Sequence, residues 1–64
     1  MKTLAQMCRD IRIELNISQS KLAERVGSNQ TEMSFIERGF IPCWGVEKKI
    51  RLLHKEVIGK YFEE

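Results

Sequence analysis

The chain has 64 residues, of which 42% are hydrophobic and 31% charged, and its formal net charge is +2 at pH 7. This length leaves room for one small domain over residues 1–64, and the composition excludes a disordered chain. The sequence lacks the apolar run of about 18 residues that a membrane span needs. The mild charge does not by itself indicate a nucleic-acid partner.

The chain has two cysteines and one histidine. Cys8 and Cys43 can pair in a secreted protein, but no signal peptide precedes them, so we expect reduced cytoplasmic thiols that act as small apolar residues. Together with His54 they fall short of four zinc ligands and lack the close spacings of a zinc site. We therefore expect no metal and no cofactor.

Apolar residues at helical spacing predict a first helix from about Thr3 to Asn16, with Thr3 as its N-cap. The stripe that faces the core consists of Leu4, Cys8, Ile11 and Leu15.

A second helix is predicted from about Gln19 to Val26. Ser18 precedes it as a suitable N-cap, and its inner face is Leu22, Ala23 and Val26. Gly27 follows directly, where a residue with positive φ commonly ends a helix. We therefore expect a tight turn at Gly27-Ser28.

A third helix is predicted from about Gln30 to Arg38, with Met33 and Ile36 as its apolar stripe. Asn29 offers an N-cap, and Glu32 three residues later completes a pattern that resembles a capping box. Gly39 supplies the end of this helix. Two short helices and a turn of this length form a helix-turn-helix, whose second helix can enter a DNA major groove.

The segment after Gly39 is unusually apolar, and its proline and glycine predict a loop over Phe40–Gly45. A fourth helix is expected from about Val46 to His54. A final turn or helix from about Lys55 to Phe62 is weakened by Gly59. The fold class expected is therefore all-α, a compact bundle of four to five short helices.

The central stretch resembles the phage-repressor and Cro type of helix-turn-helix, often called the XRE family, in the pattern Gln19-x-x-Leu22-Ala23-x-x-Val26-Gly27-x-x-Gln30-x-x-Met33-x-x-Ile36-Glu37-Arg38-Gly39. The resemblance covers about Leu4 to Leu53 and implies a lambda-repressor-like fold. It also implies a phage or bacterial transcriptional regulator, most simply a repressor, that reads the major groove with the helix at residues 29–38.

In the resembling repressors, the positions of Gln30, Thr31 and Phe35 contact bases. The Gln30 amide matches the N6/N7 edge of adenine, and Thr31 can bond a base or phosphate and touch a thymine methyl. Ser34 lies one turn further on and is included among the candidates. Phe35 departs from the polar residue common in the family, so it either presses on thymine methyls or packs against the apolar loop.

Contacts to the DNA backbone are expected from Gln19, Lys21, Ser28, Asn29 and Arg38, with Arg9 as a further source of charge. In the family, the counterpart of Gln19 touches a phosphate and supports the first glutamine of the reading helix. Each basic residue can equally be a solvated surface residue. Glu32 either caps its own helix or accepts a hydrogen bond from a cytosine amine.

The family resemblance also implies one pair of residues with a structural role. Arg12 and Glu37 match the positions of an internal salt bridge in related repressors, which would hold the reading helix to the first helix. Removing one partner of a buried pair costs about 3–5 kcal/mol.

Related proteins often place lysines or arginines after the glycine that ends the third helix, whereas this chain has an apolar segment. If exposed, Phe40, Ile41 and Trp44 are candidate contacts of a homodimer. Two reading helices about 34 Å apart would then read a palindromic double-stranded DNA.

The alternative is a protein-interaction module on the same fold, such as an antitoxin or partner-binding regulator. The modest charge, Glu32 and the apolar segment favour it. The sequence shows no nucleophile–base pair and no paired carboxylates, so we do not expect an enzyme.

Overall fold

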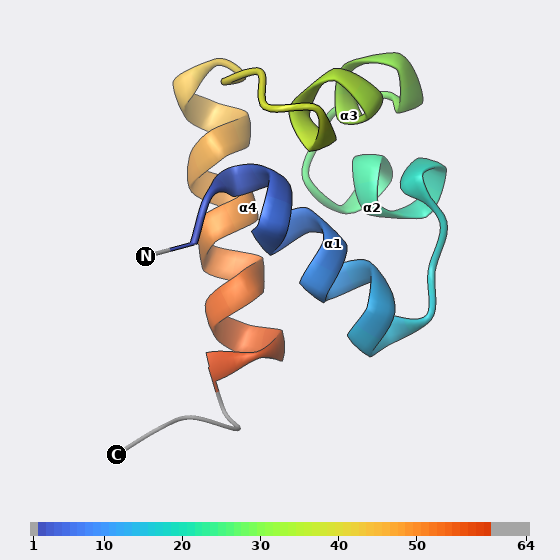
Figure 1. The fold of residues 1–64 in the computed structure, drawn as a ribbon, viewed down its shortest axis with the longest axis vertical. Coiled ribbons are helices and arrows are strands. Elements are labelled where there is room, and N and C mark those ends of the chain that lie inside the picture. The colour runs from blue at the N-terminus through green and yellow to red at the C-terminus, as the bar shows by residue number, and fades with distance from the viewer. Residues whose placement is uncertain (1, 60–64) are drawn as a thin grey trace.

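The computed structural model describes residues 2–59, which form four helices and no strand (Figure 1). They are α1 (Leu4–Leu15), α2 (Gln19–Arg25), α3 (Gln30–Glu37) and α4 (Trp44–Val57). α1 lies in the middle and packs against each of the other three helices, with α4 on one side and α2 and α3 on the other (Figure 1). The predicted all-α class is confirmed. None of the helices in this part of the chain is long and apolar enough to cross a membrane.

A single apolar core lies between these helices, because each helix presents one apolar stripe at helical spacing. Its buried residues are Leu4, Cys8, Ile11, Leu22, Ala23, Val26, Met33, Ile36, Val46 and Ile50. Ile17, which precedes α2, is half-buried and packs against the edge of this core.

The turn between α2 and α3 follows from its capping residues. Gly27 has a φ of 74°, and the N–H of Ser28 donates to the carbonyl of Ala23 at 2.8 Å, which closes α2. The Ser18 hydroxyl accepts from the N–H of Lys21 at the other end of α2. Both of these predicted helix ends are confirmed.

The predicted bounds of the fourth helix are wrong at both ends. It begins at Trp44, so Gly45 lies in its first turn and not in a loop. Glycine is tolerated there because the N–H groups of a first turn have no partner within the helix. The helix continues to Val57 because Val57 is buried in register with Val46 and Ile50.

The final turn or helix was predicted from about residue 55. Residues 55–57 instead belong to the end of α4. The rest of that prediction, at residues 60–62, lies outside the described residues.

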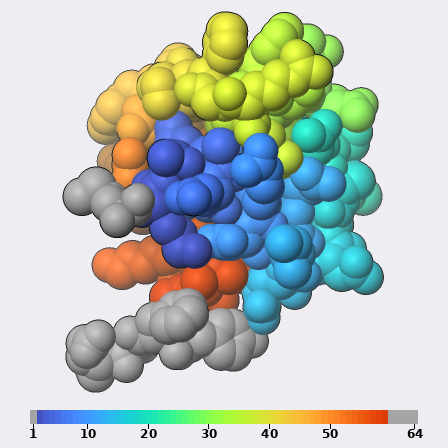
Figure 2. Space-filling view, in the orientation of Figure 1, coloured from blue at the N-terminus to red at the C-terminus, as the bar shows by residue number. Residues whose placement is uncertain are grey.

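The segment that joins α3 to α4 lies at the surface. In the space-filling view it forms the yellow upper edge of the molecule (Figure 2). Phe40, Ile41 and Trp44 are 64%, 70% and 72% exposed. These three residues, named above as candidate homodimer contacts if exposed, are therefore surface residues in this chain.

Candidate nucleic-acid interface

The start of α3 is fixed by side-chain hydrogen bonds. The Asn29 side chain accepts from the N–H of Glu32 at 2.8 Å, so the predicted N-cap is confirmed. The predicted capping box is wrong, because the Glu32 carboxylate accepts from the hydroxyl of Ser28 and not from the N–H of Asn29. Glu32 thus braces the turn before α3, and its charge lies near the positive end of that helix.

One open hollow contains all the residues expected to contact bases. It has a volume of about 330 Å³ and is lined by Gln19, Gln30, Thr31, Ser34, Phe35 and Arg38. We call it the polar hollow. Gln30, Thr31 and Arg38 are exposed, whereas Ser34 is half-buried. Amide, hydroxyl and guanidinium groups therefore meet on one accessible face of α3.

Three residues expected at the DNA backbone lie outside the polar hollow. Lys21 is exposed on α2, and the Ser28 hydroxyl is engaged with Glu32. Asn29 caps α3 and lines the neighbouring groove. The structure thus brings only Gln19 and Arg38 together with the expected base contacts.

Phe35 is held by the way α3 ends. Gly39 has a φ of 114°, and the N–H of Phe40 donates to the carbonyl of Phe35 at 3.0 Å. This helix-ending motif brings the side chains on either side of the glycine into contact. The two phenylalanine rings lie 5.3 Å apart between centroids, and the Arg38 guanidinium lies 5.7 Å from the Phe35 ring. Phe35 packs on the apolar segment and still remains 42% exposed.

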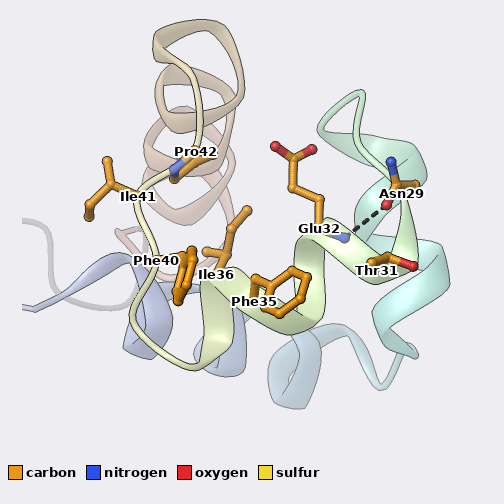
Figure 3. A pocket seen from close by; sticks show the side chains of 8 residues that line it. All are labelled: Asn29, Thr31, Glu32, Phe35, Ile36, Phe40, Ile41 and Pro42. Atoms are coloured by element: carbon orange, nitrogen blue, oxygen red, sulfur yellow. Dashed lines mark hydrogen bonds between the residues drawn. The ribbon is translucent and has the colours of Figure 1, made fainter.

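A second depression lies on the other side of α3 (Figure 3). It has a volume of about 420 Å³ and is lined by Asn29, Thr31, Glu32, Phe35, Ile36, Phe40, Ile41 and Pro42. We call it the apolar groove. In Figure 3 the Glu32 side chain rises from α3 between Asn29 and Pro42. Thr31 and Phe35 line both depressions, so they form the ridge between them.

Partly buried hydrogen bonds join the end of α3 to α1 and α2. One Arg12 nitrogen, Nη1, donates to the two carboxylate oxygens of Glu37 at 2.9 and 3.0 Å, and Gln19 donates to one of them at 3.4 Å. Arg9 donates to the Glu37 main-chain carbonyl at 2.6 Å. The ion pair implied by the family resemblance is present, and it sets the position of α3.

Two of these residues, Arg9 and Gln19, have contacts that differ from the ones expected of them. Arg9 stabilises the carboxyl end of α3 instead of projecting freely, and its i,i+3 spacing from Arg12 is the sequence signal that both share a face. Gln19 is directed at Glu37, and within the described residues no hydrogen bond joins it to Gln30.

The two thiols lie in different environments. Burial, with a further contribution from the Glu37 carboxylate, raises the pKa of Cys8 to about 12. Both cysteines were expected to act as small apolar residues, and of the two only Cys8 is buried in the core, whereas Cys43 is exposed. Within residues 2–59 no cluster of three or more His, Cys, Asp or Glu side chains is placed to hold a metal ion.

Comparisons of the chain with protein-family models, with curated proteins and with solved structures found no match. Function is therefore inferred from the residues and their geometry.

Proposed function

We propose that this chain is a sequence-specific DNA-binding regulator of transcription, in the simplest case a cytoplasmic repressor of phage or bacterial origin. α2 and α3 act as a helix-turn-helix, and α3 reads the major groove. The observation that carries the proposal is the polar hollow, where Gln30, Thr31, Ser34 and Phe35 share one accessible face with Arg38.

The size and chemistry of this face suit the major groove. α3 is a helix of eight residues. An α-helix with its side chains is about 10–12 Å across, and the major groove is about 12 Å wide. The Gln30 amide can donate to and accept from one adenine edge. Thr31 and Phe35, as the ridge, offer a methyl group and a ring to thymine methyls.

Arg38 in the polar hollow and Lys21, which is exposed on α2, supply charge for phosphates. A second copy of the chain would bring a second α3, and two reading helices about 34 Å apart would match a palindromic operator. Repression would follow from exclusion of polymerase at that site.

The experiment is fluorescence anisotropy with a randomised duplex pool and with one non-specific duplex, at low and moderate salt. We expect affinity to fall steeply with salt, because neutralised phosphates release counterions. Gln30→Ala should remove selectivity among sequences and leave non-specific binding nearly unchanged. Loss of a good bidentate pair costs about 1–3 kcal/mol, or about 5- to 150-fold.

Lys21 and Lys55 form a matched pair for the backbone contacts, because both are exposed and Lys55 lies in the last turn of α4, a helix that does not pack against α2. Lys21→Ala should weaken binding uniformly across sequences and lower the salt slope by about one unit, and Lys55→Ala should do neither. An affinity that changes neither with salt nor with the substitutions Gln30→Ala and Lys21→Ala would refute the proposal.

The second candidate function is a protein-interaction module on the same fold. It is favoured by the exposed apolar residues Phe40, Ile41 and Trp44. The salt series separates the two functions, because an apolar protein interface is far less sensitive to salt than a phosphate interface.

A further inference from the structure

The apolar groove beside α3 has the size of a small-ligand site. Its volume of about 420 Å³ lies within the range of about 300–1,000 Å³ that such sites usually have. Figure 3 shows that its two ends differ in chemistry. Asn29 and Thr31 lie near the start of α3, whereas Phe40, Ile41 and Pro42 form the other end. A molecule that fills the groove therefore needs one polar end and one apolar end.

The polar end of the groove carries a negative charge. Of the described residues, eight line the groove, and Glu32 is the only charged one among them. Its Oε1 atom accepts from the Ser28 hydroxyl. Its Oε2 atom accepts no hydrogen bond and forms no ion pair within residues 2–59. A phosphate or carboxylate is therefore repelled from the groove, and a cation is attracted.

The apolar end of the groove offers an exposed aromatic ring. The ring of Phe40 is tilted against that of Phe35, with 5.3 Å between their centroids. The Arg38 guanidinium lies over Phe35, but no cation of the described part of the chain lies over Phe40. A further ring can pack on Phe40, because offset and tilted aromatic pairs attract each other. An aromatic amine in its ammonium form matches both ends of the groove.

We propose that the apolar groove binds a small organic ammonium ion with an aromatic body. The ammonium group donates to the free carboxylate oxygen of Glu32, and the ring packs on Phe40 beside Ile41 and Pro42. Hydrogen bonds between two charged groups are stronger than those between neutral groups. The carboxylate therefore gives the site its selectivity for a cation, which its apolar walls alone do not supply.

A ligand in the groove opposes DNA binding by α3. Thr31 and Phe35, as the ridge, line the groove as well as the polar hollow. An α-helix with its side chains is already about 10–12 Å across, and the major groove is about 12 Å wide. A ring added beside the ridge therefore leaves α3 no room in the major groove. This competition rests on the proposed function, whereas binding of the ligand does not.

The test uses phenethylammonium as the probe, with phenethyl alcohol and hydrocinnamate as its neutral and anionic counterparts. In NMR spectra of the isotope-labelled full chain, the ammonium should shift the amide signals of Thr31, Phe40 and Ile41 but not those of Lys55 and Glu56. Its dissociation constant should be on the order of 1 mM, because the probe is small and the groove is open. The alcohol should bind about three- to tenfold more weakly, and hydrocinnamate should not bind.

Matched substitutions test the two ends of the site. Glu32→Gln keeps an acceptor for the Ser28 hydroxyl but removes the charge, so affinity for the ammonium should fall to that for the alcohol. Glu56→Gln removes the same charge from an exposed position on α4 and should have no effect. Phe40→Ala should weaken binding of both probes at least threefold. Trp44→Ala removes an exposed ring that does not line the groove and should weaken neither.

Circular dichroism confirms that each variant is folded before its affinity is compared. The comparison of the ammonium with the alcohol needs no variant, so it remains decisive if Glu32→Gln fails to fold. Amide signals that do not move at about 20 mM phenethylammonium overturn the proposal. Equal affinities for the ammonium and the alcohol, or an affinity that Glu32→Gln leaves unchanged, overturn it as well.

Fluorescence anisotropy with a duplex that the chain binds tests the competition at constant ionic strength. At about ten times its own dissociation constant, phenethylammonium should raise that of the DNA about elevenfold. A chain that binds the probe but no DNA contradicts the proposed function and leaves the ligand site standing. A chain that binds probe and DNA without interference contradicts the competition.

Discussion

Glu37 is the one charged residue that is buried in the described part of the chain. Its carboxylate accepts two hydrogen bonds from Arg12 and one from Gln19. Glu37→Ala leaves the Arg12 guanidinium without its partner, which costs about 3–5 kcal/mol for a fully buried pair. The Arg12 side chain is 31% exposed and can reach water, so we expect a loss of about 2–4 kcal/mol of unfolding free energy.

Urea unfolding followed by circular dichroism measures this loss. Glu14→Ala is the matched control, because Glu14 is exposed on α1 and its change should stay within about 0.5 kcal/mol. Equal unfolding midpoints for both variants would show that the ion pair contributes nothing to the position of α3.

The two cysteines should differ in reactivity by orders of magnitude. With the pKa of Cys8 raised to about 12, only about one thiol in 10⁴ is ionised at pH 8, and the thiolate is the reactive form. A thiol-specific reagent should therefore modify one thiol per folded chain quickly and the second only after unfolding. Cys43→Ser should abolish the fast phase. Two equally fast thiols in the folded protein would contradict the burial of Cys8.

At the scale of the element, glycine has opposite roles on the two sides of the apolar segment. Gly39 has a φ of 114°, which a residue with a side chain adopts only with strain, whereas Gly45 lies in α4 with open space around an added methyl group. Gly39→Ala should destabilise the protein by about 1–3 kcal/mol. Gly45→Ala should stabilise it by about 0.5–1 kcal/mol, since it lowers the entropy of the unfolded chain.

Thermal melts of these two variants give the comparison directly, because the substitution is the same. Shifts of the melting temperature in the same direction would mean that α3 does not end with a left-handed residue at Gly39.

How far the elements could be predicted from the sequence depended on whether their signals were local. Ser18, Gly27, Asn29 and Gly39 act within a few residues of themselves, so the ends of α2 and α3 were predictable. The start of α4 was not, because a proline before a helix and a glycine in its first turn, here Pro42 and Gly45, give the same signal as in a loop.

The candidate site, too, was predictable from the sequence only where its signals are local. Gln30, Thr31 and Ser34 share a face because helical spacing places them there. The contacts of Arg9 and Gln19 with Glu37 join segments 28 and 18 residues apart. Such contacts depend on how the helices pack, which the local pattern does not specify.

At the scale of the whole molecule, α1 joins all the other parts. Its apolar stripe enters the core, while Arg9 and Arg12 bind the end of α3. On another face, Asp10 accepts from Lys2 at 2.6 Å and lies 3.4 Å from the His54 ring nitrogen on α4. The position of α3 is thus coupled through one helix to the helix that carries Trp44.

The Asp10 cluster predicts how this assembly responds to acid. The hydrogen bond from Lys2, and then that from His54, lowers the pKa of Asp10 below its ordinary value of 3.8. A carboxyl whose pKa is lower in the folded state binds fewer protons there than in the unfolded chain. Its stabilising contribution is therefore complete above about pH 4 and is lost as the pH falls through the lowered pKa.

Asp10→Asn removes this contribution, so the difference in unfolding free energy from wild type should be largest near pH 7 and should shrink as the pH falls below about 4. Urea unfolding at intervals of one pH unit measures that difference. Glu14→Gln removes a carboxyl that is exposed on the same helix, for which residues 2–59 offer no ion pair. A difference for Asp10→Asn that stays constant from pH 7 to pH 2 would show that the carboxylate charge does not hold α1 to α4.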